Sequence, residues 1–306
     1  MAESPAAPSP LIFDRALIRA RRGRAASMGP ATFLLDRVAD DLADRLAAVL
    51  RRFELALDLG TPGEAVRAAL SRLGSVGTVV AADAIPASGG ALASKSVVAD
   101  EEALPFCDAA FDLVVSALAL QFVNDLPGVL VQIRHALKPD GLFLAALIGG
   151  ETLTELRQSF AEAESDVEGG ASPRVAPFAD LRDLGGLLQR AGFALPVADA
   201  DRVSVRYDSA FALMHDLRRM GATNALVDRR RAPLKRTTLM RMAEIYARRF
   251  SDNDGRIRAT FEVLWLSGWA PHPGQQQPLR PGSAKTRLAD ALGTREISTG
   301  EKAGRA

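Results

Sequence analysis

Cysteine, histidine and long apolar runs are scarce in this sequence of 306 residues, and each shortage excludes a class of protein. The single cysteine, Cys107, excludes an intramolecular disulfide and any zinc site built from cysteines. The three histidines stand far apart and form no His-x-x-x-His pattern, and no Gly-x-Ser-x-Gly sequence occurs. We therefore predict no metal site and no catalytic triad, and the sequence by itself assigns no catalytic residue.

Charge is nearly balanced, with 38 basic and 37 acidic side chains. This balance favours neither nucleic-acid binding nor attachment to a membrane surface. No apolar run approaches the roughly 20 residues of a membrane-spanning helix, so membrane insertion is not expected. A basic segment over residues 15–24 predicts a solvated helix face. With no apolar signal core near residue 1, a cytoplasmic location is the expectation.

Short apolar runs alternate with amphipathic stretches in the first half of the chain. The predicted strands are 55–59, 78–82, 96–99, 111–116 and 142–147, and the predicted helices are 33–52, 65–73 and 126–137. Strands that are apolar on both faces and alternate with helices are typical of a parallel sheet covered on both sides. The sequence therefore predicts an α/β fold.

The second half of the chain has a less regular pattern. It predicts helices over 151–164, 181–192, 210–220 and 235–250, and strands over 201–207 and 259–266. From residue 274 onward the sequence is polar and interrupted by glycine and proline, which is typical of disorder. We therefore predict a flexible N-terminus over 1–10, one domain over 11–272, and a largely disordered tail over 273–306.

Ligands of open α/β sheets bind beyond the carboxyl ends of the strands, so the residues at these ends are candidates for a site. The first strand runs into a glycine turn between Gly60 and Gly63, where backbone N–H groups can approach a ligand closely. Asp83 ends the second strand about 20 residues later, which is the position of a carboxylate that accepts hydrogen bonds from ribose hydroxyls. The alternative for Asp83 is an ordinary strand-ending aspartate in a solvated loop.

Asp100 follows the third predicted strand and is open to two interpretations. A carboxylate there can accept a hydrogen bond from an adenine amino group. Asp100 is also followed by two glutamates, a pattern that suits the N-cap and first turn of a helix. The sequence does not separate these alternatives.

A resemblance to class I S-adenosylmethionine-dependent methyltransferases rests on residues 55–60 (LALDLG), 82–83 (AD), 111–115 (FDLVV) and 137–141 (LKPDG). Within that class the chain is similar to the fifth-assembly-factor family of mitochondrial complex I and its alphaproteobacterial relatives. The more specific matches are residues 12–15 (IFDR), 99–106 (ADEEALPF), 123–127 (VNDLP) and 149–153 (GGETL). The carrier-protein O-methyltransferase of biotin synthesis shares the first set of segments.

The resemblance implies a Rossmann-like class I methyltransferase fold, with a seven-stranded, mainly parallel sheet and helices on both faces. It implies a cofactor-binding half over 45–150 and an acceptor half over 151–272, in which helices over 210–250 cover the acceptor. The strands near 201 and 261 would form the closing hairpin. The implied cofactor is S-adenosyl-L-methionine. Its implied contacts are Asp58, Gly60, Gly63, Asp83, Asp100, Glu101, Ser116 and Leu118.

The glycine turn departs from the family pattern. The family continues with alternating glycines, whereas this chain has Pro62, which lacks an N–H group, and Glu64. Gln121 and Phe122 stand where the family has His-Trp. Cofactor binding is therefore expected to be weaker. Three functions stay open: a methyltransferase, a complex I assembly factor that hydroxylates an arginine of a peripheral-arm subunit, and a non-catalytic binding protein.

Overall fold

The computed structural model describes residues 11–86, 95–275, 283 and 286–295. The chain divides into two compact units, residues 1–271 and 272–306. The predicted flexible segment 1–10 lies outside the described residues, as does much of the predicted tail. The described part of the second unit contains one short helix, α9 (Leu288–Leu292). No helix among the described residues is long and apolar enough to cross a membrane.

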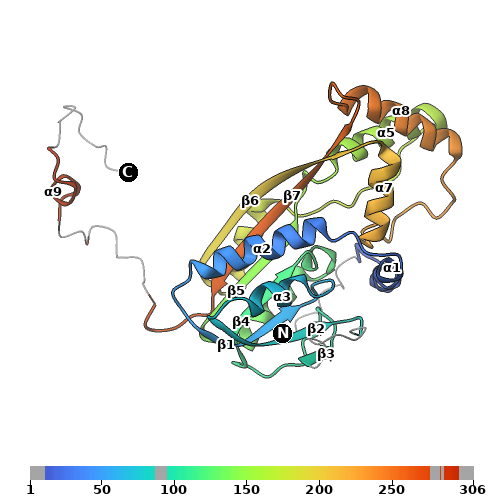
Figure 1. The fold of residues 1–306 in the computed structure, drawn as a ribbon. Coiled ribbons are helices and arrows are strands. Elements are labelled where there is room, and N and C mark those ends of the chain that lie inside the picture. The colour runs from blue at the N-terminus through green and yellow to red at the C-terminus, as the bar shows by residue number, and fades with distance from the viewer. Residues whose placement is uncertain (1–10, 87–94, 276–282, 284–285, 296–306) are drawn as a thin grey trace, which may run out of the picture. The chain divides into compact units, whose positions relative to one another are not determined.

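A seven-stranded sheet forms the centre of the first unit, in the order β3-β2-β1-β4-β5-β7-β6 (Figure 1). Its strands are β1 (Phe53–Leu59), β2 (Val76–Asp83), β3 (Ser96–Val98), β4 (Phe111–Ala117), β5 (Leu137–Ile148), β6 (Ala194–Tyr207) and β7 (Ile257–Trp269). The first five run parallel, and β7 pairs antiparallel with both β5 and β6. The predicted sheet and its closing hairpin are therefore confirmed.

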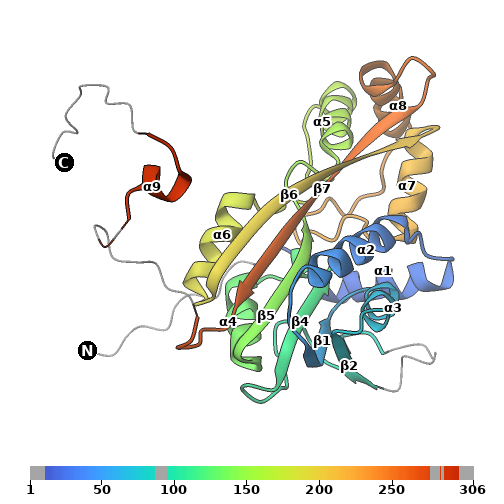
Figure 2. The same cartoon turned by 60° about the vertical axis from the view of Figure 1, so that its left-hand side comes forward.

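Helices cover both faces of this sheet (Figures 1 and 2). One face packs against α2 (Phe33–Ala47), α3 (Ala65–Ser71), α5 (Thr154–Glu168), α7 (Ala210–Arg219) and α8 (Arg236–Phe250). The other packs against α4 (Leu126–Ala136), α6 (Leu181–Arg190) and the short helix η2 (Leu120–Phe122). Helix α1 (Arg15–Ser27) contacts α7.

The side chains of β1 point alternately to the two faces of the sheet, and each face is covered by helices. Ala56 packs into the hydrophobic cluster beneath α2 and α3. Leu57 and Leu59 pack into the cluster beneath α4 and α6. Successive side chains of a strand point to opposite faces, so a strand in the middle of a covered sheet must be apolar throughout. This requirement is the physical origin of the pattern that predicted the fold.

The structure corrects three predicted boundaries. Helix α2 ends at Ala47 rather than at residue 52, because the chain has to turn into β1 at Phe53. Lys138 to Gly141 is part of β5 and not a loop that closes a helix. Strands β6 and β7 are longer than predicted because they pair with each other over almost their full length. That pairing is invisible to a local pattern.

Candidate functional site

The parallel register brings the ends of β1 and β2 together. Leu59 lies opposite Ala82, and the Gly60 N–H donates a hydrogen bond to the Ala82 carbonyl oxygen at 2.7 Å. Gly60 adopts a left-handed conformation with φ of +70°, and a Cβ there would lie 3.0 Å from the Glu101 Cγ atom. Position 60 therefore needs glycine for both its backbone conformation and the close approach of Glu101.

A cavity of about 510 Å³ opens beyond these strand ends. Four of the predicted cofactor residues line it: Gly63, Asp83, Glu101 and Leu118. Much of the remaining wall is apolar and includes Ile18, Leu34, Leu35, Ile148, Leu153, Phe178, Leu217 and Phe261. A cavity of this volume, with apolar walls and a few polar groups, is typical of a small-molecule site.

The other predicted cofactor residues lie outside the cavity lining. Asp58 is buried, with 1% of its surface exposed, and its Oδ2 atom accepts a hydrogen bond from Arg67 at 2.9 Å. Burial raises the pKa of Asp58 to about 6, against the opposite effects of Thr61 and Arg67. The Ser116 hydroxyl donates to the Leu59 carbonyl oxygen at 2.7 Å and thereby joins two strands. A cofactor role for Asp58, Gly60, Asp100 and Ser116 stays a prediction.

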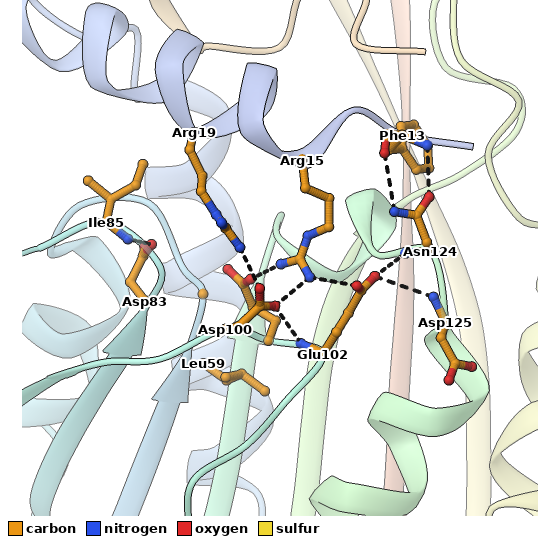
Figure 3. Close-up of polar contacts among 12 residues, drawn as sticks. Phe13, Arg15, Arg19, Leu59, Asp83, Ile85, Asp100, Glu102, Asn124 and Asp125 are labelled. Atoms are coloured by element: carbon orange, nitrogen blue, oxygen red, sulfur yellow. Dashed lines mark hydrogen bonds and ion pairs between the residues drawn. The ribbon is translucent and has the colours of Figure 1, made fainter. Parts of the chain in front are cut away.

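Helix α1 supplies a set of contacts that the sequence analysis missed. Arg15 pairs with Asp100 at 2.5 Å, with Glu102 at 2.9 Å and with Glu101, and Arg19 also pairs with Asp100 at 2.5 Å (Figure 3). Burial acts to raise the pKa of Asp100, but the Glu102 N–H and Arg15 outweigh it, so the pKa is lowered. Asp100 is therefore part of an ion-pair cluster in a turn, and it caps no helix.

Arg22, on the same face of α1, reaches the predicted ribose carboxylate. Its Nη2 atom lies 2.5 Å from the Asp83 Oδ2 atom and donates to the Gly60 carbonyl oxygen at 3.2 Å. The side chains of Arg15 and Arg22 are each only 16% exposed. The prediction of a solvated basic face was therefore wrong for these two residues. Their spacing of seven places them on one helix face, a signal that the sequence contained.

Two of the segments that carry the family resemblance, residues 12–15 and 123–127, meet at the start of α1. The Asn124 Oδ1 atom accepts hydrogen bonds from the N–H groups of Ile12 and Phe13, both at 2.8 Å (Figure 3). Asp14 caps α1 by accepting from the Leu17 N–H at 3.0 Å. These contacts hold α1 against the strand-end loops, which explains why both segments have a specific sequence.

The acceptor side differs from the prediction. Of the helices over 210–250 that were predicted to cover the acceptor, only the end of α7 and the turn after it line the cavity, through Leu217 and residues 219–222. Helix α8 packs against α5 and β7 instead. Gln121 lines the cavity and donates to the Leu118 carbonyl oxygen at 2.8 Å, while its Oε1 atom is buried without a partner in the described part of the chain. Gln121 thus provides a free hydrogen-bond acceptor.

The turn between Gly60 and Gly63 is left-handed at both glycines. Gly63 has a φ of +72°, and a Cβ added there would meet no atom of the described residues within 4 Å. The Thr61 hydroxyl oxygen accepts from the Ala117 N–H at 3.0 Å, which fixes the turn to β4. The side chain of Glu64 lies 4.0 Å from Arg67. The described residues contain no group of three or more histidine, cysteine or acidic side chains arranged to hold a metal ion.

The strand order and the cavity at the strand ends define a class I methyltransferase fold. Residues 57–145 match the methyltransferase domain family. The chain is 16% identical to the YcgJ protein from Bacillus subtilis, with a TM-score of 0.51 over 76% of this chain and 98% of that one. This likeness supports the fold.

The full-length relatives define the family more narrowly. The chain is 42% identical to the human protein named arginine-hydroxylase NDUFAF5, mitochondrial, over 91% of this chain and 83% of that protein. The chain belongs to the NDUFAF5 family. It is also 35% identical to a malonyl-[acyl-carrier protein] O-methyltransferase from Halorhodospira halophila, over 84% of this chain and 88% of that protein.

Proposed function

We propose that the chain binds S-adenosyl-L-methionine in the cavity beyond β1 and β2, and that it is an enzyme linked to respiratory complex I assembly. The observation that carries this proposal is the position of Asp83, which ends β2 and lines a largely apolar cavity of about 510 Å³. An acidic side chain at this point of an α/β sheet is suited to accept hydrogen bonds from the two hydroxyls of an unphosphorylated ribose.

The residues around the cavity fit this cofactor. Asp83 supplies a partly exposed carboxylate at the end of β2, and most of the cavity wall beside it is apolar, as an adenosyl group requires. Gly63 and Leu118 line the wall without any charge, and α1 covers the acidic loops. Arg22 already occupies the Asp83 Oδ2 atom, so the ribose hydroxyls compete with Arg22 for that atom. Binding therefore includes a local rearrangement of one side chain, which fits the weaker affinity expected from the sequence.

S-adenosylmethionine supplies an electrophilic methyl group when it is bound. The chain's own contribution would be to orient the acceptor and exclude water, with proximity providing most of the rate. Gln121 is suited to position the acceptor, because its Oε1 atom has no partner in the described residues and its neighbours line the same cavity. No acidic or basic side chain is assigned a proton-transfer role.

Arginine hydroxylation is the second candidate, and the names of the family members at 39–42% identity favour it. In this version the partner is a peripheral-arm subunit of complex I, and a C–H bond of one of its arginines becomes C–OH, with dioxygen as the oxidant and a two-electron reductant as the co-reactant that takes the second oxygen atom to water. The carrier-protein O-methyltransferase relatives support a third candidate function, in which the methyl group is transferred to a malonyl group on an acyl-carrier protein. A cytoplasmic location is part of the proposal, whereas the human NDUFAF5 relative is named as a mitochondrial protein.

Calorimetric titration with S-adenosylmethionine and S-adenosylhomocysteine tests the cofactor. We expect saturable binding that Asp83→Ala weakens at least about tenfold, because two charge-assisted hydrogen bonds from the ribose hydroxyls replace the one from Arg22, a net gain of about 1.5–3 kcal/mol. No binding at millimolar ligand would refute the proposal. A deletion strain and mass spectrometry of complex I subunits then separate the reactions, since an added methyl group and an added oxygen atom differ in mass. Normal complex I in that strain would remove the assembly role.

A further inference from the structure

Helix α1 has a second basic face, opposite the one that covers the cofactor cavity. Leu17, Arg21 and Arg24 follow a spacing of four and three residues and so share one side of the helix. They line two neighbouring recesses of about 470 and 240 Å³, and Arg21 lines both. We call the two recesses together the arginine groove. Its other lining residues are Arg174, Arg218, Thr223, Asn224, Arg229, Arg230 and Arg231.

Positive charge in the arginine groove exceeds the negative charge around it. Arginine supplies seven of the lining residues, and no carboxylate of the described residues lines either recess. Three of the seven make ion pairs just outside the groove: Arg174 with Glu164, Arg229 with Asp14 and Arg230 with Glu168. The other four, Arg21, Arg24, Arg218 and Arg231, have no ion-pair partner in the described ranges. The whole chain carries a net charge of only +1, so this local excess is large.

Arg21 lies at the junction of the two recesses. Its Nη1 atom donates to the Asn224 carbonyl oxygen. Burial, Arg229 and Arg24 lower the pKa of Arg21 and outweigh the opposite effect of Asp14. Like charges held this close destabilise the folded chain unless an anion neutralises them. Binding of an external anion would relieve the repulsion that Asp14 leaves uncompensated.

The shape and composition of the groove identify the kind of anion. Two recesses in a row offer more room than a single small anion fills, and guanidinium groups suit carboxylates through paired hydrogen bonds. No aromatic side chain of the described residues lines either recess, so bases of a nucleic acid would have no stacking surface. We propose that the arginine groove is a docking surface for an acidic segment of a protein partner.

The groove lies next to the cofactor cavity. Leu217 and Arg219 line the cavity, whereas Arg218 lines the groove, so the end of α7 separates the two. Helix α1 also lies between them, and Figures 1 and 2 both place it beside α7. A helix with its side chains is about 10–12 Å across, so a segment docked in the groove would be separated from the cavity by about the width of α1. Docking itself does not depend on cofactor binding.

Fluorescence anisotropy of a labelled oligoglutamate peptide with the full chain tests this proposal. The variant carries Arg24→Glu and Arg218→Glu, which break no ion pair among the described residues. The matched control carries Arg182→Glu and Arg190→Glu on α6, with the same change in charge outside the groove. We expect the groove variant to bind at least about tenfold more weakly and the control to stay within about twofold, with binding that weakens as salt rises.

Several results would overturn the proposal. Equal losses of peptide affinity in the groove variant and the control would show that the peptide responds to the overall charge of the protein and not to the arginine groove. Tighter binding of an oligothymidylate of equal charge would assign the groove to nucleic acid. Displacement of the peptide by millimolar inorganic phosphate would make it a small-anion site. If the groove variant loses its circular dichroism spectrum, Arg24→Gln with Arg218→Gln replaces it, and unchanged peptide binding by that variant would also contradict the proposal.

Discussion

Replacing Arg22 by alanine should strengthen cofactor binding, because Arg22 competes with the ribose for Asp83. The two side chains lie 2.5 Å apart and are only 16% and 20% exposed. Solvent therefore screens the pair weakly, and Arg22 also donates to the Gly60 carbonyl oxygen at 3.2 Å. A ligand that takes over Asp83 must first break these contacts.

The size of the effect follows from the contact that is given up. A hydrogen bond between charged groups contributes about 1.5–3 kcal/mol net. Since each 1.4 kcal/mol corresponds to a factor of about ten in affinity, Arg22→Ala should lower the dissociation constant of S-adenosylhomocysteine about ten- to a hundredfold. Isothermal titration calorimetry measures this directly. Arg24→Ala is the matched control, because Arg24 is on the same helix and outside the cofactor cavity.

A second substitution shows whether competition is the cause. Asp83→Ala should weaken binding in the wild-type chain, and the gain from Arg22→Ala should disappear when Asp83 is absent. Weaker or unchanged binding by Arg22→Ala alone would refute the reasoning. Weaker binding would mean that Arg22 contacts the cofactor itself, and the pairing with Asp83 would then be a resting arrangement without an energetic cost for binding.

Three further predictions concern the stability of the fold. Asp58→Ala leaves the buried Arg67 guanidinium without its partner and should lower the free energy of unfolding by about 3–5 kcal/mol in urea denaturation; a loss below about 1 kcal/mol would contradict this. Hydrogen bonds from Thr238 and Arg230, with the charges of Arg230 and Lys235, lower the pKa of Glu168 from 4.5 to about 2, so the stabilisation from these contacts exists above pH 4.5 and is lost as the pH falls toward 2. The unfolding free energy of Glu168→Gln should therefore depend less on pH in that window, and equal slopes would count against these contacts. Leu42→Ala, at a fully buried position of α2, should cost about 2–5 kcal/mol and lower the melting temperature.

Much of the architecture could be predicted, because it depends on which side chains must avoid water. The β1 strand is apolar on both faces, and this local property identifies a strand in a covered parallel sheet. The position of Asp83 at the end of β2 is equally local, and so the cavity-lining role of Asp83 was within reach of the sequence. Gly63, Glu101 and Leu118 line the same cavity, and their contact with a cofactor stays a prediction.

The sequence by itself determined the order of strands and helices and the acidic residue at the end of β2, since each follows from patterns within a few residues. Only the tertiary structure decided what the arginines of α1 contact. Arg22 meets Asp83 across 61 positions of the chain, and Arg15 meets Asp100 across 85. Charge attraction is not specific to one partner, so composition cannot choose among the acidic side chains. The packing of α1 against the strand ends and α7 makes that choice, and it also creates the arginine groove.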